Sequence, residues 1–178
     1  MALLINAYNG YTLQLILENY PKVKSIRDIK SPWKTARYKV GKATVSLDNI
    51  EHHLLRPIYK DPRIHFAVNC ASVGCPPLLN EAFTGASLEK QLNAATKATL
   101  TSPLYIKTQG DTLKVTSILK WYGGDFTNTT YKGHTKTVAA FVAKYALPDV
   151  ASMIKKQNNA PPVSYLDYDW RLNDTKTK

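Results

Sequence analysis

The sequence predicts an α+β fold, a single compact domain over residues 1–178 with helices packed on a small mixed or antiparallel sheet and two short hairpins. Three observations predict this class. Apolar residues recur at helical spacing in several segments, two pairs of short strand-like segments flank glycine turns, and the elements do not follow a regular βαβ alternation. The length of 178 residues and the 44% hydrophobic composition suit one globular domain.

The first helix is predicted over residues 2–19, where apolar side chains recur along one face. Pro21 follows this pattern and stops it. A short hairpin is then predicted over residues 38–45, with its turn at Gly41-Lys42.

A second helix is predicted to begin near Asp48, where Glu51 three residues later completes a capping box, and to end at Pro57. Residues 64–70 are the clearest predicted strand, because apolar residues alternate there with others. Residues 71–80 then form a loop punctuated by glycine and proline.

The rest of the chain follows the same rules. The predicted elements are a helix over 87–100 capped by Ser87, a hairpin of residues 104–108 and 112–116, helices at about 135–146 and 149–156, a last strand over 163–167, and a flexible tail over 171–178.

The start of the chain predicts neither a membrane span nor a signal peptide. No run of about 18 apolar residues occurs anywhere. Residues 1–5 are apolar, but Asn6 interrupts them and no basic leader or cleavage site accompanies them. A helical pattern that begins at residue 2 without a cap predicts a natural sequence cut upstream.

The net charge of +11 favours acidic partners, such as an acidic polymer or anionic headgroups. The lysines are nevertheless scattered along the chain, and no dedicated nucleic-acid motif accompanies them. A solvated basic surface explains the same composition without any partner.

The chain has two cysteines, Cys70 and Cys75. Their spacing matches no zinc pattern, so the sequence predicts neither a metal site nor a bound cofactor. A disulfide between them is left open. On the predicted strand, Cys70 shares the apolar face and is expected to be a small buried hydrophobe. Cys75 follows Gly74 in the loop, where a reactive thiol or an ordinary packed thiol would fit.

A cysteine nucleophile needs a base and a group that orients the base. His52 lies one helical turn after Asp48, which could hold its ring by an i,i+4 contact. His65 is separated from Cys70 by about 16 Å of extended strand, so Cys75 would have to double back to reach it. Glu51 is the other candidate orienting carboxylate. An ordinary surface or core role fits each histidine as well.

The candidate substrate-binding positions are Asn6, Asn9, Asn69 and Gly74. Gly74 permits close approach by a substrate. Asn6 and Asn9 lie among apolar residues of the first helix, where buried amides must find hydrogen-bond partners. Bracing of a loop would satisfy them equally well.

Several motifs resemble a large family of proteins, the domain of unknown function family numbered 547. They are Asn6-Ala7-Tyr8-Asn9, Ser46-Leu47-Asp48-Asn49-Ile50-Glu51-His52, the central block from Asp61 to Ser72 followed by Gly74-Cys75-Pro76-Pro77-Leu78, Lys120-Trp121-Tyr122-Gly123 with Asp125-Phe126, and the closing Tyr165-Leu166-Asp167-Tyr168-Asp169-Trp170. The likeness covers nearly the whole chain.

The resemblance implies little about activity. Family members usually carry a Phe-Trp pair where this chain has Leu3-Leu4, and they extend further upstream. Export signals on many bacterial members imply a periplasmic or secreted setting. Some eukaryotic members occur beside glutaredoxin-like modules, which hints at thiol chemistry.

Three functions remain in competition. The first is a thiol-dependent hydrolase or acyl transferase for amide or ester bonds of a small molecule or peptide, with Cys75 attacking, His52 or His65 taking its proton, and Asp48 or Glu51 orienting the ring. Asn6 or an amide near Gly74 would bind the oxyanion. The second is a non-catalytic module that binds an acidic partner. The third is a redox protein that uses Cys70 and Cys75.

Overall fold

The computed structural model describes residues 1–175 and confirms the α+β class. Its helices are α1 (Ala2–Asn19), α2 (Arg56–Tyr59), α3 (Leu88–Leu100), α4 (Ile118–Trp121), α5 (Gly123–Thr127), α6 (Val138–Val142) and α7 (Pro148–Lys156). Two 3-10 helices, η1 (Ile26–Asp28) and η3 (Pro62–Phe66), and a π-type helix, η2 (Asn49–Leu55), complete the helical part. The strands are β1 (Tyr38–Val40), β2 (Ala43–Val45), β3 (Ile106–Gln109), β4 (Thr112–Val115) and β5 (Val163–Tyr165).

The two predicted hairpins form two separate sheets. β1 pairs antiparallel with β2 as an isolated hairpin, and its turn contains Gly41 at φ +60°. β3 pairs antiparallel with β4 around Gly110 at φ +54°, and β5 joins β4 in parallel to give a mixed sheet. Both turns need the left-handed conformation that glycine adopts without strain. No helix within residues 1–175 is long and apolar enough to cross a membrane.

The predicted strand over residues 64–70 is wrong. Pro62–Phe66 form the 3-10 helix η3, whose first turn is capped by the Asp61 side chain accepting from the Arg63 amide at 3.1 Å. An acidic N-cap followed by proline is a helix start signal. The alternation arises because η3 joins two hydrophobic clusters: Ile64 packs in one and Phe66 in the other.

The predicted second helix begins near the expected place but is capped differently. Asp48 makes no capping hydrogen bond; Ser46 and Asn49 cap each other instead, at 3.0 and 3.1 Å. The helix also passes through Pro57, because the wide turns of η2 lead into α2, where proline occupies the first turn. Glu51 is thereby free for another role. The helices α4 and α5 were not predicted.

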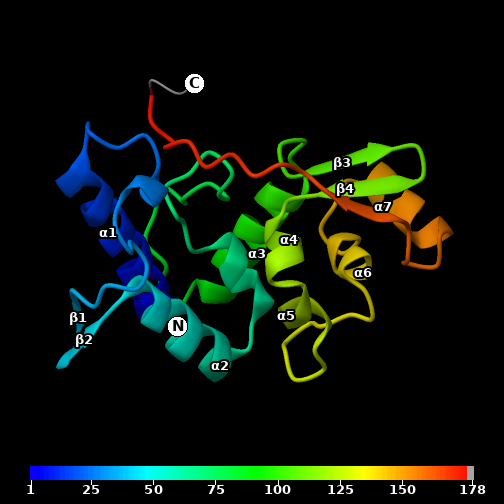
Figure 1. The fold of residues 1–178 in the computed structure, drawn as a ribbon. Helices are drawn as coiled ribbons and strands as arrows, with labels where there is room; N and C mark the ends of the chain where they lie inside the picture. Colours follow the sequence, from blue (N-terminus) through cyan, green and yellow to red (C-terminus); the bar gives the residue numbers. More distant parts are fainter. Residues whose placement is uncertain (176–178) are drawn as a thin grey trace.

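A closing segment, residues 163–174, returns along the molecule from the sheet to the first helix (Figure 1). Its Leu172 is buried in the cluster that contains α1, and the Leu172 amide donates to the Lys24 carbonyl at 2.7 Å. The Asn173 amide donates to Ala71 at 2.9 Å. The tail predicted over 171–178 is therefore held by hydrogen bonds in its described part, and residues 176–178 lie outside the described residues.

Candidate functional site

A cavity of about 440 Å³ lies where the two hydrophobic clusters meet. Six of the residues singled out in the sequence line it: Asp48, Glu51, His52, His65, Cys70 and Cys75. A volume of this size is ordinary for a small-molecule site. The fold therefore gathers the predicted catalytic residues from three separate motifs around one space.

One part of the lining, the sulfur wall, consists of Cys70, Cys75 and Tyr168, and Ser72 is hydrogen-bonded to Tyr168 behind them. The two cysteines form a disulfide. Cys75 is only 4% exposed, whereas Cys70 is partly exposed. The prediction that Cys70 is buried is therefore wrong, because it relied on the side-chain parity of a strand that does not exist. Of the two interpretations left open for Cys75, the packed sulfur matches its burial.

Polar hydrogens surround the Cys75 sulfur. The Cys70 amide donates to Cys75 Sγ at 2.9 Å, and the Tyr168 hydroxyl donates to the same sulfur at 3.1 Å. This hydroxyl is also 3.2 Å from Cys70 Sγ and accepts from Ser72 Oγ at 3.1 Å. Burial raises the pKa of Tyr168 to about 12, so the phenol keeps its proton at neutral pH.

The closing segment fixes the loop that carries the disulfide. The Gly74 amide donates to the Asp169 carbonyl and the Val73 amide to the Arg171 carbonyl, both at 2.9 Å. A side chain at Gly74 would meet the Asp169 amide nitrogen and the Tyr168 ring at 3.1 Å. Gly74 thus permits close approach, as predicted, but the approaching group is the closing segment; its role toward a substrate stays a prediction.

A second part of the lining, the histidine wall, consists of Glu51, His65 and Tyr122, with Arg56 and Asp125 behind them. Glu51 is 5% exposed, and its charge acts on the phenols of Tyr8 and Tyr122. Burial first, and then the charge of Glu51, raises the pKa of both phenols well above its usual range. Both tyrosines therefore keep their protons at neutral pH.

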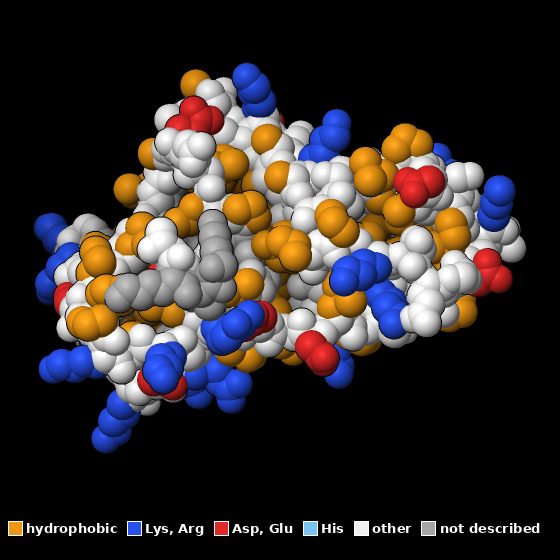
Figure 2. All heavy atoms as spheres, turned by 90° about the horizontal axis from the view of Figure 1, so that it is seen from above, with side chains coloured by type: hydrophobic (Ala, Val, Ile, Leu, Met, Phe, Trp, Pro, Cys, Tyr) orange, Lys and Arg blue, Asp and Glu red, His pale blue; other side chains and the backbone are white. Residues whose placement is uncertain are grey.

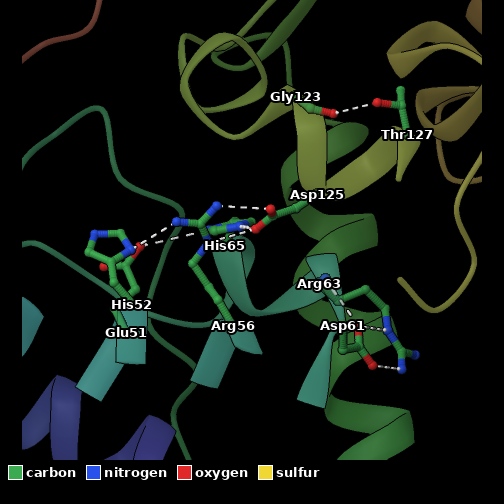
Figure 3. A network of polar contacts seen from close by, with 9 residues as sticks. All are labelled: Glu51, His52, Arg56, Asp61, Arg63, His65, Gly123, Asp125 and Thr127. Carbon is green, nitrogen blue, oxygen red and sulfur yellow. Dashed lines mark hydrogen bonds and ion pairs between the residues drawn. The ribbon is translucent and has the colours of Figure 1, made fainter. Parts of the chain in front are cut away.

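Asp125 holds the His65 ring in place. His65 Nε2 lies 2.8 Å from Asp125 Oδ2, and the Arg56 guanidinium binds both oxygens of that carboxylate at 2.7 and 2.8 Å (Figure 3). Burial alone would raise the pKa of Asp125, but the hydrogen bonds from His65 and Arg56 outweigh it and hold this pKa well below its usual value. The Tyr122 ring stacks on the imidazole with centroids 3.9 Å apart.

The two candidate histidines differ in which lone pair is free. A guanidinium only donates, so His52 Nδ1, 3.0 Å from Arg56 Nη1, must accept its proton. A carboxylate only accepts, so His65 Nε2 carries the hydrogen given to Asp125. His65 Nδ1 is buried and has no hydrogen-bond partner among residues 1–175, and a carboxylate oxygen of Glu51 is 3.9 Å away. Of the two candidate histidines, His65 is therefore the one with a free lone pair.

Asp48 behaves as expected toward His52, whose Nε2 lies 3.8 Å from Asp48 Oδ1 in an i,i+4 contact. The predicted amide residues serve the backbone. Asn6 bonds to the Phe83 peptide through both ends of its amide, at 2.8 and 2.9 Å. Asn9 links Ala67 to Asn69, and Asn69 bridges the Pro76 carbonyl and the Ala71 amide. The contacts of Asn9 and Asn69 brace the disulfide loop, whereas Asn6 holds the Phe83 peptide. A substrate-binding role for the three stays a prediction.

Sequence reasoning assigned no role to several residues of the cavity. They are Tyr168 and the three tryptophans Trp33, Trp121 and Trp170 in the lining, and the Arg56–Asp125 pair behind it. Most belong to the Trp-Tyr-Gly-Gly-Asp-Phe and Tyr-Asp-Trp stretches, which stood out as motifs without an assigned chemistry. Within residues 1–175, no three His, Cys, Asp or Glu side chains are arranged to hold a metal ion.

A family model described as "Protein of unknown function, DUF547" matches residues 1–99. The chain belongs to the DUF547 family. The part that matches the model carries both cysteines, Glu51 and His65, whereas Asp125, Tyr168 and two of the three tryptophans come from the rest of the chain. No curated protein and no solved structure matches the chain.

Proposed function

We propose that the cavity is the active site of a thiol–disulfide exchange enzyme, with the Cys70–Cys75 disulfide as its reacting group. The observation that carries the proposal is the position of this bond: it lines a cavity, one of its sulfurs is partly exposed, and the other receives two hydrogen bonds. A disulfide also suits the periplasmic or secreted setting that we propose for the protein.

The exchange begins with attack on the accessible sulfur. A substrate thiolate attacks Cys70 Sγ, forms a mixed disulfide and expels Cys75 as a thiolate. The Cys70 amide and the Tyr168 hydroxyl then stabilise the negative sulfur, because hydrogen bonds to a charged acceptor are the stronger kind. A second thiol of the substrate attacks the mixed disulfide, leaves as the oxidised substrate, and yields two protein thiols.

His65 supplies the base in this scheme. Its free Nδ1 takes the proton of the incoming thiol, while Asp125 holds the ring through Nε2 at 2.8 Å. Glu51, 3.9 Å from Nδ1, faces the positive charge that forms on the imidazole. The proton later passes to the departing thiolate, so atoms and charges balance over the cycle, and a disulfide of a partner molecule reoxidises the protein.

The test uses the two single-cysteine variants, Cys70→Ser and Cys75→Ser. Each is incubated with glutathione disulfide, and mixed-disulfide formation is followed by intact mass. Cys75→Ser should form the adduct on Cys70 quickly, because this sulfur is partly exposed. Cys70→Ser should react slowly, because Cys75 is 4% exposed.

Adducts at equal rates, or a faster adduct on Cys75, would contradict the assigned order of attack. A far-ultraviolet circular dichroism spectrum that matches the wild-type spectrum is required of both variants.

A thiol-dependent hydrolase or acyl transferase is the second candidate, and the free Nδ1 of His65 favours it. In the reduced protein, Cys75 would attack a carbonyl and His65 would take the thiol proton, with Asp125 in the orienting role first given to Asp48 or Glu51. Reduced protein should then release a stoichiometric burst of nitrophenol from 4-nitrophenyl acetate, and Cys75→Ser should abolish it. Absence of this burst, with exchange intact, leaves the oxidoreductase.

A further inference from the structure

We infer that the cavity of the oxidised protein binds a ligand carrying an ammonium or guanidinium group. This inference goes beyond the proposed function and does not depend on it, because the binding is argued from the cavity alone.

The aromatic residues of the cavity form one continuous cluster. Trp121 lies with its ring 4.8 Å from Tyr168 and 5.8 Å from Trp170, and Trp33 lies 6.0 Å from Trp170. Trp121 is 48% exposed, which is unusual for so large an apolar ring. Clustered indole and phenol faces attract cations, because the ring quadrupole is negative above the plane.

The protein already places its own cations on rings of this cavity. The Arg27 guanidinium lies 5.2 Å from the centroid of Trp170, and the Arg56 guanidinium lies 5.2 Å from that of Tyr122. The His65 ring covers Tyr122 as well, so Tyr122 has little surface left for a ligand. The rings of Trp33, Trp121 and Tyr168 carry no such guanidinium among the described contacts.

The charge of the lining is opposite to that of the whole chain. The chain carries +11, but the charged residues that line the cavity are two carboxylates, Asp48 and Glu51, against one lysine, Lys34. Two negative charges against one positive leave the lining at −1 with both histidines neutral. Lysine and arginine side chains are spread over the face of the molecule that Figure 2 shows, but the lining of the cavity gives an anionic ligand no net attraction.

The free nitrogen of His65 favours a ligand that can donate a hydrogen bond. His65 is 3% exposed, and its Nδ1 accepts no hydrogen bond from any described residue. A buried nitrogen without a partner costs free energy unless a ligand satisfies it. An N–H of an ammonium or guanidinium group would donate to Nδ1 and remain close to the Glu51 carboxylate, 3.9 Å from that nitrogen. This arrangement distinguishes such a ligand from a quaternary ammonium, which has no N–H.

The experiment titrates oxidised protein with three ligands of matched chain length, butylammonium, butan-1-ol and butyrate, at constant ionic strength. All three tryptophans of the chain line the cavity, so their indole N–H signals in a ¹H–¹⁵N spectrum report on this site. We expect butylammonium to bind about tenfold more tightly than butan-1-ol, equivalent to roughly 1.4 kcal/mol, and butyrate more weakly than either.

Two variants sharpen the titration. Glu51→Gln should remove the preference for the cation, and Trp121→Leu should weaken it; Glu18→Gln, an identical change at an exposed position of α1, should leave it unchanged. Four outcomes would overturn the inference. Butan-1-ol could bind as tightly as butylammonium, or butyrate could bind more tightly than it. Tetramethylammonium could bind as tightly as butylammonium, or none of the ligands could bind. Because binding is measured on the oxidised protein, these outcomes leave the exchange reaction untested, and failure of the exchange leaves the binding result standing.

Discussion

The two walls of the cavity are built in different ways. The sulfur wall belongs to a loop, residues 70–75, which is held from outside by backbone hydrogen bonds of the closing segment. The histidine wall rests on paired charges: Arg56 binds Asp125 through two hydrogen bonds, and Asp125 binds His65. The Cys70–Cys75 bond, which would break in the exchange, thus lies on a loop. His65, which would move a proton, is instead fixed by ion pairs. A reacting bond needs room to open, and a base needs a constant geometry.

The largest expected effect comes from His65. His65→Gln removes the free nitrogen of the histidine wall while leaving the sulfur wall intact, so the exchange rate at pH 7 should fall by roughly 10²–10⁴-fold, the usual contribution of a positioned base. His53→Gln is the matched control, because His53 is exposed on the neighbouring helix η2. The rate is followed as reduction of the protein disulfide by a monothiol in stopped flow. An unchanged rate in His65→Gln would mean that the two walls do not cooperate.

Asp125→Asn should cost the most stability. The neutral amide removes the charge that binds Arg56, and we expect a cost of about 3 kcal/mol, the low end of the range for a buried pair, because the Arg56 side chain is 28% exposed. Urea unfolding of the oxidised protein measures this free energy. Asp149→Asn, at an exposed position of α7, should change the free energy of unfolding by only a few tenths of a kcal/mol.

The same carboxylate predicts a pH dependence. The pKa of Asp125 in the folded protein lies well below its ordinary value of 3.8, so its contribution to stability is fully present above that value and is lost as the pH falls below it. Wild type should therefore lose stability below about pH 4, and Asp125→Asn should lose less over the same interval. If the unfolding free energies of the two proteins fell in parallel with decreasing pH, Asp125 would not be the source of this dependence.

Tyr168→Phe tests the sulfur wall without altering its shape. It removes the hydroxyl that donates to Cys75 Sγ at 3.1 Å but keeps the ring. A hydrogen bond to a charged acceptor is worth about 1.5–3 kcal/mol, so alkylation of the reduced protein by iodoacetamide at pH 6 should slow by roughly tenfold at Cys75. Peptide mass analysis separates the two sulfurs. Tyr165→Phe, on the same segment and 43% exposed, is the control that should behave as wild type.

Gly74→Ala is the mildest change. The added methyl would lie 3.1 Å from the Asp169 nitrogen and from the Tyr168 ring, so the closing segment must shift by a few tenths of an ångström, at a cost of about 1 kcal/mol. Thermal unfolding detects this change. Gly85→Ala should have no such effect, because nothing lies within 4 Å of the added methyl. Equal shifts in the two variants would mean that the closing segment does not hold the loop.

Most of the longer local elements of this fold could be predicted from the sequence, whereas the contacts between distant residues around the cavity could not. α1 was predicted with its observed bounds, and both hairpins were found from their glycine turns. The strand over 64–70 failed because the alternation of Ile64 and Phe66 reflects two cores rather than two faces of a sheet. Periodicity records which residues are buried, not which cluster buries them.

The same limit applies to the site. Glu51, His52, His65 and the cysteines stood out by residue type, and the fold places all of them around one cavity. The partner of His65 is Asp125, 60 residues away, and the partner of the sulfurs is Tyr168, 93 residues from Cys75. No local pattern connects positions so distant. The choice between His52 and His65 likewise depended on Arg56, whose hydrogen bond to His52 is a property of the folded chain.

The central claim is that the Cys70–Cys75 bond reacts while the protein is folded. The most direct measurement is the rate at which dithiothreitol reduces the native protein at pH 7, with intact mass counting the hydrogens gained and the tryptophan signals reporting the fold. The account predicts a gain of two hydrogens in folded protein, faster than the reduction of glutathione disulfide under identical conditions. A bond that stays intact until urea unfolds the chain would show that it is a structural crosslink and would contradict the account.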